Sequence, residues 1–98
     1  MNIEKMRNDN SITILVSGRL DTLTAPEFEK EIEGLEENIT ELIIDMKNLE
    51  YTSSAGLRAL LKAQKFMSGK GTMKIINVNE TIKEVFDITG FSEILSIN

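Results

Sequence analysis

Three consecutive hydroxyl residues, Thr52, Ser53 and Ser54, stand between an apolar run and a helical pattern. Serine and threonine at a helix start can accept hydrogen bonds from the free N–H groups of the first turn. One cap needs only one hydroxyl, so capping does not explain all three residues. The crevice beyond the carboxyl ends of strands in open α/β sheets is also where ligands and partners bind. Gly56 follows inside the predicted helix, where glycine costs about 1 kcal/mol relative to alanine and lets another group approach closely. Capping alone and a functional surface are therefore both open interpretations.

The composition excludes several kinds of catalytic and binding site. The 98 residues contain no His and no Cys, so the usual zinc sites, disulfides and Ser-His-Asp or Cys-His pairs cannot form. There is no phosphate-binding loop of the form G-x-x-x-x-G-K-[ST] and no nucleophile elbow. The net charge of −5 argues against nucleic acid as a partner, and no apolar run is long enough to span a bilayer. We expect a single cytoplasmic domain over residues 1–98 that is a binding module without enzymatic activity, metal, cofactor or direct membrane insertion.

The chain begins with a pattern typical of a β-hairpin. Apolar and polar residues alternate over residues 2–7 and 11–17, on either side of the turn-forming residues 8–10. Residues 18–21 are expected to form a loop after the second strand.

A helix is predicted to begin near Thr24. Thr24 and Glu27 have the spacing of a capping box, and Pro26 suits the first turn, where its missing N–H costs nothing. The apolar run at residues 42–44 then indicates a strand covered on both faces, as in a parallel sheet with helices around it.

The second half of the chain alternates helices and strands. A helix is predicted over residues 57–67 and a strand over 73–78, after which Asn79 can cap a third helix. The residues of the 57–67 helix expected to face the core are Leu57, Leu60, Leu61 and Met67. Gly90 is expected to end the third helix in the left-handed conformation, and residues 94–97 to form a short final strand. The order of elements predicts an α/β protein with a mixed sheet.

Three segments resemble the STAS domain of bacterial anti-sigma factor antagonists. Residues 49–57 (LEYTSSAGL) are similar to the family signature, which is an apolar residue, an aromatic, a small or aliphatic residue, Asp or Ser, then Ser, Ser/Thr/Ala, Gly and Leu. Residues 18–21 (GRLD) match its early G-x-L-D loop, and residues 82–91 match its late helix, which closes in Ser/Thr-Gly-Leu/Phe. The resemblance implies the STAS fold, with a mixed four- to five-stranded sheet, an N-terminal hairpin and three or more helices.

The resemblance also implies a phosphorylation switch at Ser54. In the family, an anti-sigma factor that is also a serine kinase phosphorylates the serine at this position, which blocks binding, and a serine phosphatase restores it. The unphosphorylated antagonist binds the anti-sigma factor and releases a sigma factor. Many members have Asp directly before that serine; this chain has Ser53, so Ser53 and Thr52 stand as further candidate acceptors. Asp21 matches the early-loop Asp that lies beside the phosphorylated serine.

The residues of this segment allow more than one function. The residues expected to form the partner-binding surface are Asp21, Thr52, Ser53, Ser54, Gly56, Leu57 and Arg58. Asp21 could also be an ordinary turn residue. Arg58 could be a solvated surface side chain, or it could contact a partner or a phosphate. The closest alternative function is a STAS subunit that docks on a membrane transporter's ATPase without a switch; a weak nucleotide-binding module is less favoured. A monomer and a weak dimer are both compatible with the sequence.

Overall fold

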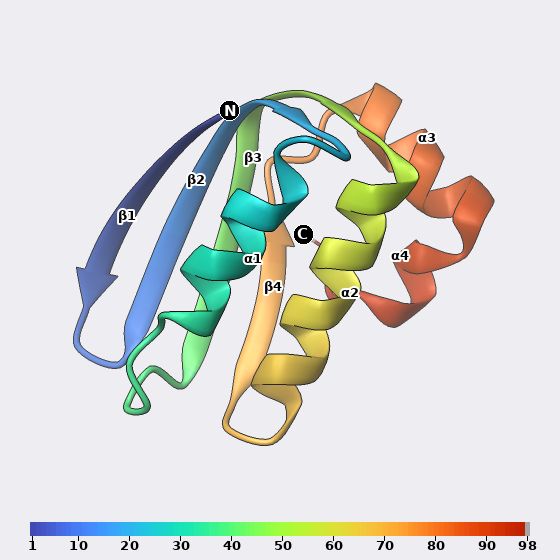
Figure 1. The fold of residues 1–98 in the computed structure, drawn as a ribbon. Coiled ribbons are helices and arrows are strands. Elements are labelled where there is room, and N and C mark those ends of the chain that lie inside the picture. Colours follow the sequence, from blue (N-terminus) through green and yellow to red (C-terminus); the bar gives the residue numbers. More distant parts are fainter. Residues whose placement is uncertain (98) are drawn as a thin grey trace.

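The computed structural model describes residues 1–97, which form a four-stranded sheet with the strand order β1-β2-β3-β4 (Figure 1). The strands are β1 (Asn2–Asn8), β2 (Ser11–Leu20), β3 (Glu41–Thr52) and β4 (Thr72–Ile76). β1 runs antiparallel to β2, whereas β2, β3 and β4 are mutually parallel. The predicted mixed sheet and N-terminal hairpin are therefore confirmed, and the hairpin turns at Asp9, whose φ is +55°.

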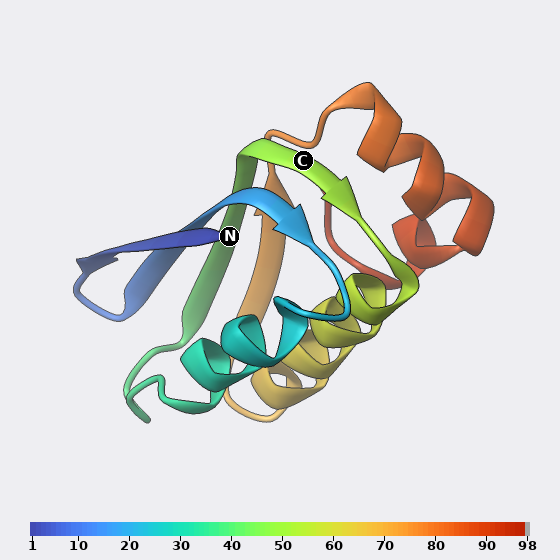
Figure 2. The ribbon, with the colours of Figure 1, turned by 45° about the horizontal axis from the view of Figure 1, so that its top comes forward.

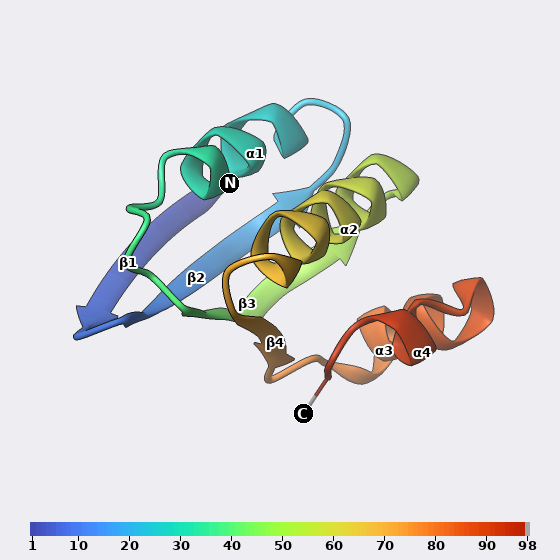
Figure 3. The same ribbon diagram turned by 90° about the horizontal axis from the view of Figure 1, so that it is seen from below.

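Two helices cover one face of this sheet. α1 (Ala25–Glu33) and α2 (Ser54–Ser68) lie side by side on one side of the strands, as Figure 3 shows with the molecule seen from below relative to Figure 1. β2 and the first half of β3 accordingly alternate between buried and half-buried residues, with Ile44 buried and its neighbour Ile43 half-buried. The prediction that residues 42–44 are covered on both faces is wrong, because strand residues of period two bury only the side that the helices cover.

The core fills the layer between the sheet and these helices. Phe28 of α1, Leu60 of α2 and Ile14 of β2 are fully buried there. Leu57 and Met67 are also buried as predicted, but Leu61 is only half-buried.

The helix starts differ from one another in how they are capped. Asn79, before α3 (Glu80–Thr89), accepts a hydrogen bond from the Ile82 N–H at 2.9 Å, as predicted. The capping box predicted at Thr24 is wrong: Thr24 has helical φ and ψ and caps no N–H of α1. Its hydroxyl donates instead to the Arg19 carbonyl, at 2.8 Å, in the loop before the helix.

The C-terminal segment also departs from the prediction. Gly90 has the expected left-handed φ of +80°, but the chain then enters a short helix, α4 (Phe91–Ile94), in place of a strand. What remains of the predicted final strand is a single parallel bridge between Ile75 and Ile97.

The two long strands, β2 and β3, extend further than the short strand β4. β3 continues to Thr52 and pairs with β2 up to Leu20, so residues 18–20, predicted as a loop, are the end of β2. β4 pairs with β3 only as far as Asp45, so β2 and β3 project together beyond β4. Within residues 1–97, no helix is both long and apolar enough to cross a membrane.

Asn79 should stabilise the fold from two sides, because its side chain caps α3 and also donates to the Leu49 carbonyl at 3.0 Å. We expect Asn79→Ala to lower the free energy of unfolding by about 1–2 kcal/mol, measured by urea denaturation. Asn38→Ala, at an exposed turn position, is the matched control and should change stability by less than about 0.5 kcal/mol. Equal effects of the two substitutions would contradict the capping role.

Candidate functional site

The site forms where β2 and β3 end and α2 begins. The Ser53 N–H donates to the Leu20 carbonyl at 2.9 Å, and Leu20 pairs with Thr52 in the sheet register. The chain segments that leave both strands therefore lie together, at the end of the sheet where α1 and α2 start (Figure 2). This brings the GRLD segment and the hydroxyl cluster, which are more than thirty residues apart, into one surface.

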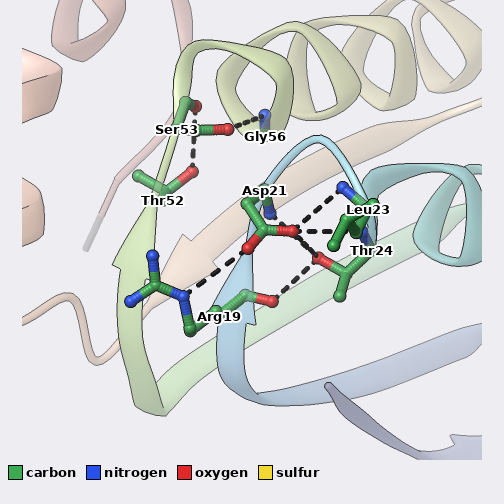
Figure 4. A network of polar contacts seen from close by, with 7 residues as sticks. All are labelled: Arg19, Asp21, Leu23, Thr24, Thr52, Ser53 and Gly56. Atoms are coloured by element: carbon green, nitrogen blue, oxygen red, sulfur yellow. Dashed lines mark hydrogen bonds and ion pairs between the residues drawn. The ribbon is translucent and has the colours of Figure 1, made fainter.

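The three neighbouring hydroxyl residues have three different environments. Thr52 is buried, and its hydroxyl donates to the Ser53 carbonyl at 3.3 Å. Ser53 is the N-cap of α2, and its Oγ accepts the Gly56 N–H at 3.4 Å (Figure 4). Ser54 is the first residue of the helix and is exposed. The capping interpretation thus accounts for Ser53 alone.

Gly56 lets the first turn of α2 pack directly on the end of β2. A Cβ at this position would lie 2.3 Å from the Thr52 Oγ1, 2.7 Å from the Leu20 carbonyl oxygen and 2.9 Å from the Leu20 Cγ. These distances are too short for any other residue without a shift of the backbone. The close approach is therefore the reason for a glycine inside this helix.

Asp21 holds the loop between β2 and α1 in shape. Its Oδ1 accepts the N–H groups of Leu23 at 3.0 Å and Thr24 at 3.2 Å, and its Oδ2 lies 3.5 Å from the Arg19 Nε (Figure 4). Partial burial raises the pKa of Asp21, but the hydrogen bonds from Thr24, Leu23 and Arg19 outweigh it, and the pKa lies below its ordinary value of 3.8. Asp21 is thus an ionised turn residue as well as a member of this surface.

Three residues that sequence reasoning did not place here complete the surface. The guanidinium of Arg19 lies 4.2 Å from the centroid of the Tyr51 ring, because the sheet register pairs these two residues. Leu23 projects from the Asp21 loop and is 88% exposed. For the Arg19–Tyr51 contact the missing signal was the register of two parallel strands, which sequence spacing alone does not give.

The residues predicted to bind a partner divide into exposed and buried ones. Ser54 and Arg58 are exposed on the same side of α2, one turn apart, and Asp21 and Ser53 are half-buried. Thr52, Gly56 and Leu57 are buried and shape the surface from beneath. Within residues 1–97, no group of three acidic side chains lies close enough to hold a metal ion.

Comparison with known proteins identifies the family of this chain. The family model described as "STAS domain" matches residues 2–98. The chain belongs to the STAS domain family. Over its full length it is 29% identical to the anti-sigma-B factor antagonist of Bacillus subtilis, of which it covers 91%.

Solved structures of STAS proteins share the fold. The chain superposes with a TM-score of 0.85 on an anti-sigma factor antagonist from Mycobacterium paratuberculosis, at 20% identity, covering 98% of this chain and 83% of that one. It also superposes on the phosphorylated form of SpoIIAA from Bacillus, with a TM-score of 0.76 and 18% identity, covering 99% and 91% of the two chains. These likenesses confirm the STAS fold that the three sequence segments implied.

Replacing Gly56 tests the close packing of α2 on β2. We expect Gly56→Ala to lower the free energy of unfolding by about 1–3 kcal/mol, because the clash with Leu20 and Thr52 outweighs a gain of about 1 kcal/mol in helix propensity. Gly69→Ala is the control, since a Cβ at Gly69 meets nothing within 4 Å. Urea denaturation of both variants measures the difference, and equal stabilities would contradict the packing argument.

The bonds of Asp21 predict a pH-dependent contribution to stability. Because the folded-state pKa is lowered below 3.8, the ionised carboxylate stabilises the fold at neutral pH, and this contribution is lost as the pH falls through the folded pKa. We expect Asp21→Asn to unfold at a lower temperature than wild type at pH 7, and the gap to narrow below about pH 4. A gap in melting temperature that stays constant from pH 7 to pH 3 would contradict the prediction.

Proposed function

We propose that residues 1–98 act as one STAS domain, a cytoplasmic and non-enzymatic anti-sigma factor antagonist controlled at Ser54. In this proposal the unphosphorylated domain binds an anti-sigma factor that is also a serine kinase, and a sigma factor is released. Phosphorylation of Ser54 blocks that binding, and a serine phosphatase restores it. The observation that carries the proposal is that Ser54 alone among the three adjacent hydroxyl residues is exposed.

The other two hydroxyls are poor acceptors for a kinase. Thr52 is 5% exposed, so its Oγ1 cannot reach an external active site without unfolding of the strand end. Ser53 is half-buried and its Oγ accepts the Gly56 N–H, so a kinase would have to draw this side chain away from the start of α2. Ser54 needs neither change, since its Oγ can attack the γ-phosphorus of ATP bound to the kinase as the bond to ADP breaks and the hydroxyl proton passes to a kinase base.

A phosphate on Ser54 would act on a partner and leave the fold intact. It adds about −1.5 to −2 charges at pH 7 beside the free N–H groups of the first turn of α2, where anions are favoured. Asp21 lies in the adjoining segment and is already ionised, so its charge adds to that of the phosphate on this surface. The existence of SpoIIAA structures in unphosphorylated and phosphorylated forms, both similar to this chain, supports such a change without refolding.

The switch can be tested with Ser54→Ala and Ser54→Asp. Wild type and both variants are used to capture partners from native lysate, the partners are identified by mass spectrometry, and binding to the purified serine kinase is measured by calorimetry. We expect wild type and Ser54→Ala to bind alike and Ser54→Asp to bind more than about tenfold more weakly, through charge repulsion. Only wild type should then gain phosphate from the kinase and ATP.

Ser96→Asp serves as the matched control, because Ser96 is also exposed but lies outside the site. Equal binding by Ser54→Asp and Ser96→Asp would reject the switch. Capture of the same transporter subunit by every variant would support constitutive docking instead. Saturable binding of ATP by the isolated domain would support a nucleotide-binding module.

A further inference from the structure

Arg58 and Ser54 are positioned to meet on the surface of α2. They are four residues apart, and side chains at this spacing lie on one face of a helix with Cβ atoms about 5–6 Å apart. Helical side chains also lean toward the N-terminus of the helix, so Arg58 extends over the turn that contains Ser54. Both residues are exposed.

Arg58 has no anionic neighbour on its own helix. α2 has no Asp or Glu between Ser54 and Ser68, and the next residue along the face of Arg58 is Lys62, which repels it. Lys62 itself is paired with Glu29 of α1, at 3.5 Å. Among residues 1–97, Arg58 takes part in no ion pair, side-chain hydrogen bond or cation–π contact.

Arg19, the other cation of this surface, is already engaged. Its Nε lies 3.5 Å from the Asp21 Oδ2, and its guanidinium lies 4.2 Å from the centroid of the Tyr51 ring. To bind a new anion, Arg19 would have to leave both partners. Arg58 has no such partners to give up.

We propose that Arg58 binds the phosphate of phosphorylated Ser54 within the same chain, an inference that rests on the proposed phosphorylation of that serine. The planar guanidinium can donate two parallel hydrogen bonds to phosphate oxygens, a geometry that lysine does not offer. Phosphorylation would then change the charge of the partner-facing surface in two ways. It adds an anion at Ser54 and withdraws the Arg58 cation from any partner that contacts it.

The test places phosphoserine at position 54 during translation, so that no kinase is needed. The second pKa of the phosphate, ordinarily about 6, is followed by phosphorus NMR. We expect Arg58→Ala to raise that pKa by about 0.3 units or more relative to wild type, and Arg58→Lys to fall between the two. Lys65→Ala is the control, since it removes an exposed cation from the same helix about three turns away and should leave the pKa unchanged.

The inference is overturned if the phosphate titrates alike in wild type and Arg58→Ala, or if Lys65→Ala shifts it as much. Because Arg58 is exposed, unphosphorylated Arg58→Ala should melt at the wild-type temperature, which separates lost phosphate binding from lost folding. The experiment also distinguishes failure of this inference from failure of the proposed function. A chain that binds no anti-sigma factor can still show the contact, and a working switch can lack it.

Discussion

The site depends on one close approach, that of the first turn of α2 to the end of β2 at Gly56. Because Gly56 has no Cβ, the helix backbone can lie against Leu20 and Thr52 at distances that any side chain would prevent. The Ser53 N–H then reaches the Leu20 carbonyl, and Asp21 follows directly in the chain. Two segments far apart in sequence become one surface through this contact.

The same approach gives adjacent hydroxyl groups separate roles. Thr52 is buried beneath the helix, Ser53 caps the N-terminus of the helix, and Ser54 is exposed to solvent. A helix start of this kind stabilises the fold with one side chain and leaves the next one available for chemistry. The serine at position 53, where many antagonists have Asp, still serves as the cap, because a hydroxyl and a carboxylate can both accept the N–H of the third residue on.

The cations around this helix start differ in whether they have a partner. Arg19 is held by Asp21 and Tyr51, so the Asp21 loop keeps its shape and Leu23 remains exposed at its tip. On α2, Lys62 is paired with Glu29 of α1, whereas Arg58 lies at the exposed end near Ser54. The surface therefore combines a fixed ion pair with a cation that has no fixed partner among the described residues.

The sequence alone determined the order of the elements as far as α3, the mixed sheet, and the start and end of α3. Asn79 capped α3 and Gly90 took the left-handed conformation, because both effects depend on neighbours within four residues. Only the tertiary structure decided which hydroxyl is exposed, which face of β3 is covered, and that Thr24 bonds to Arg19 and not to its own helix. These outcomes depend on strand register and on helix packing between distant residues, which no local spacing specifies.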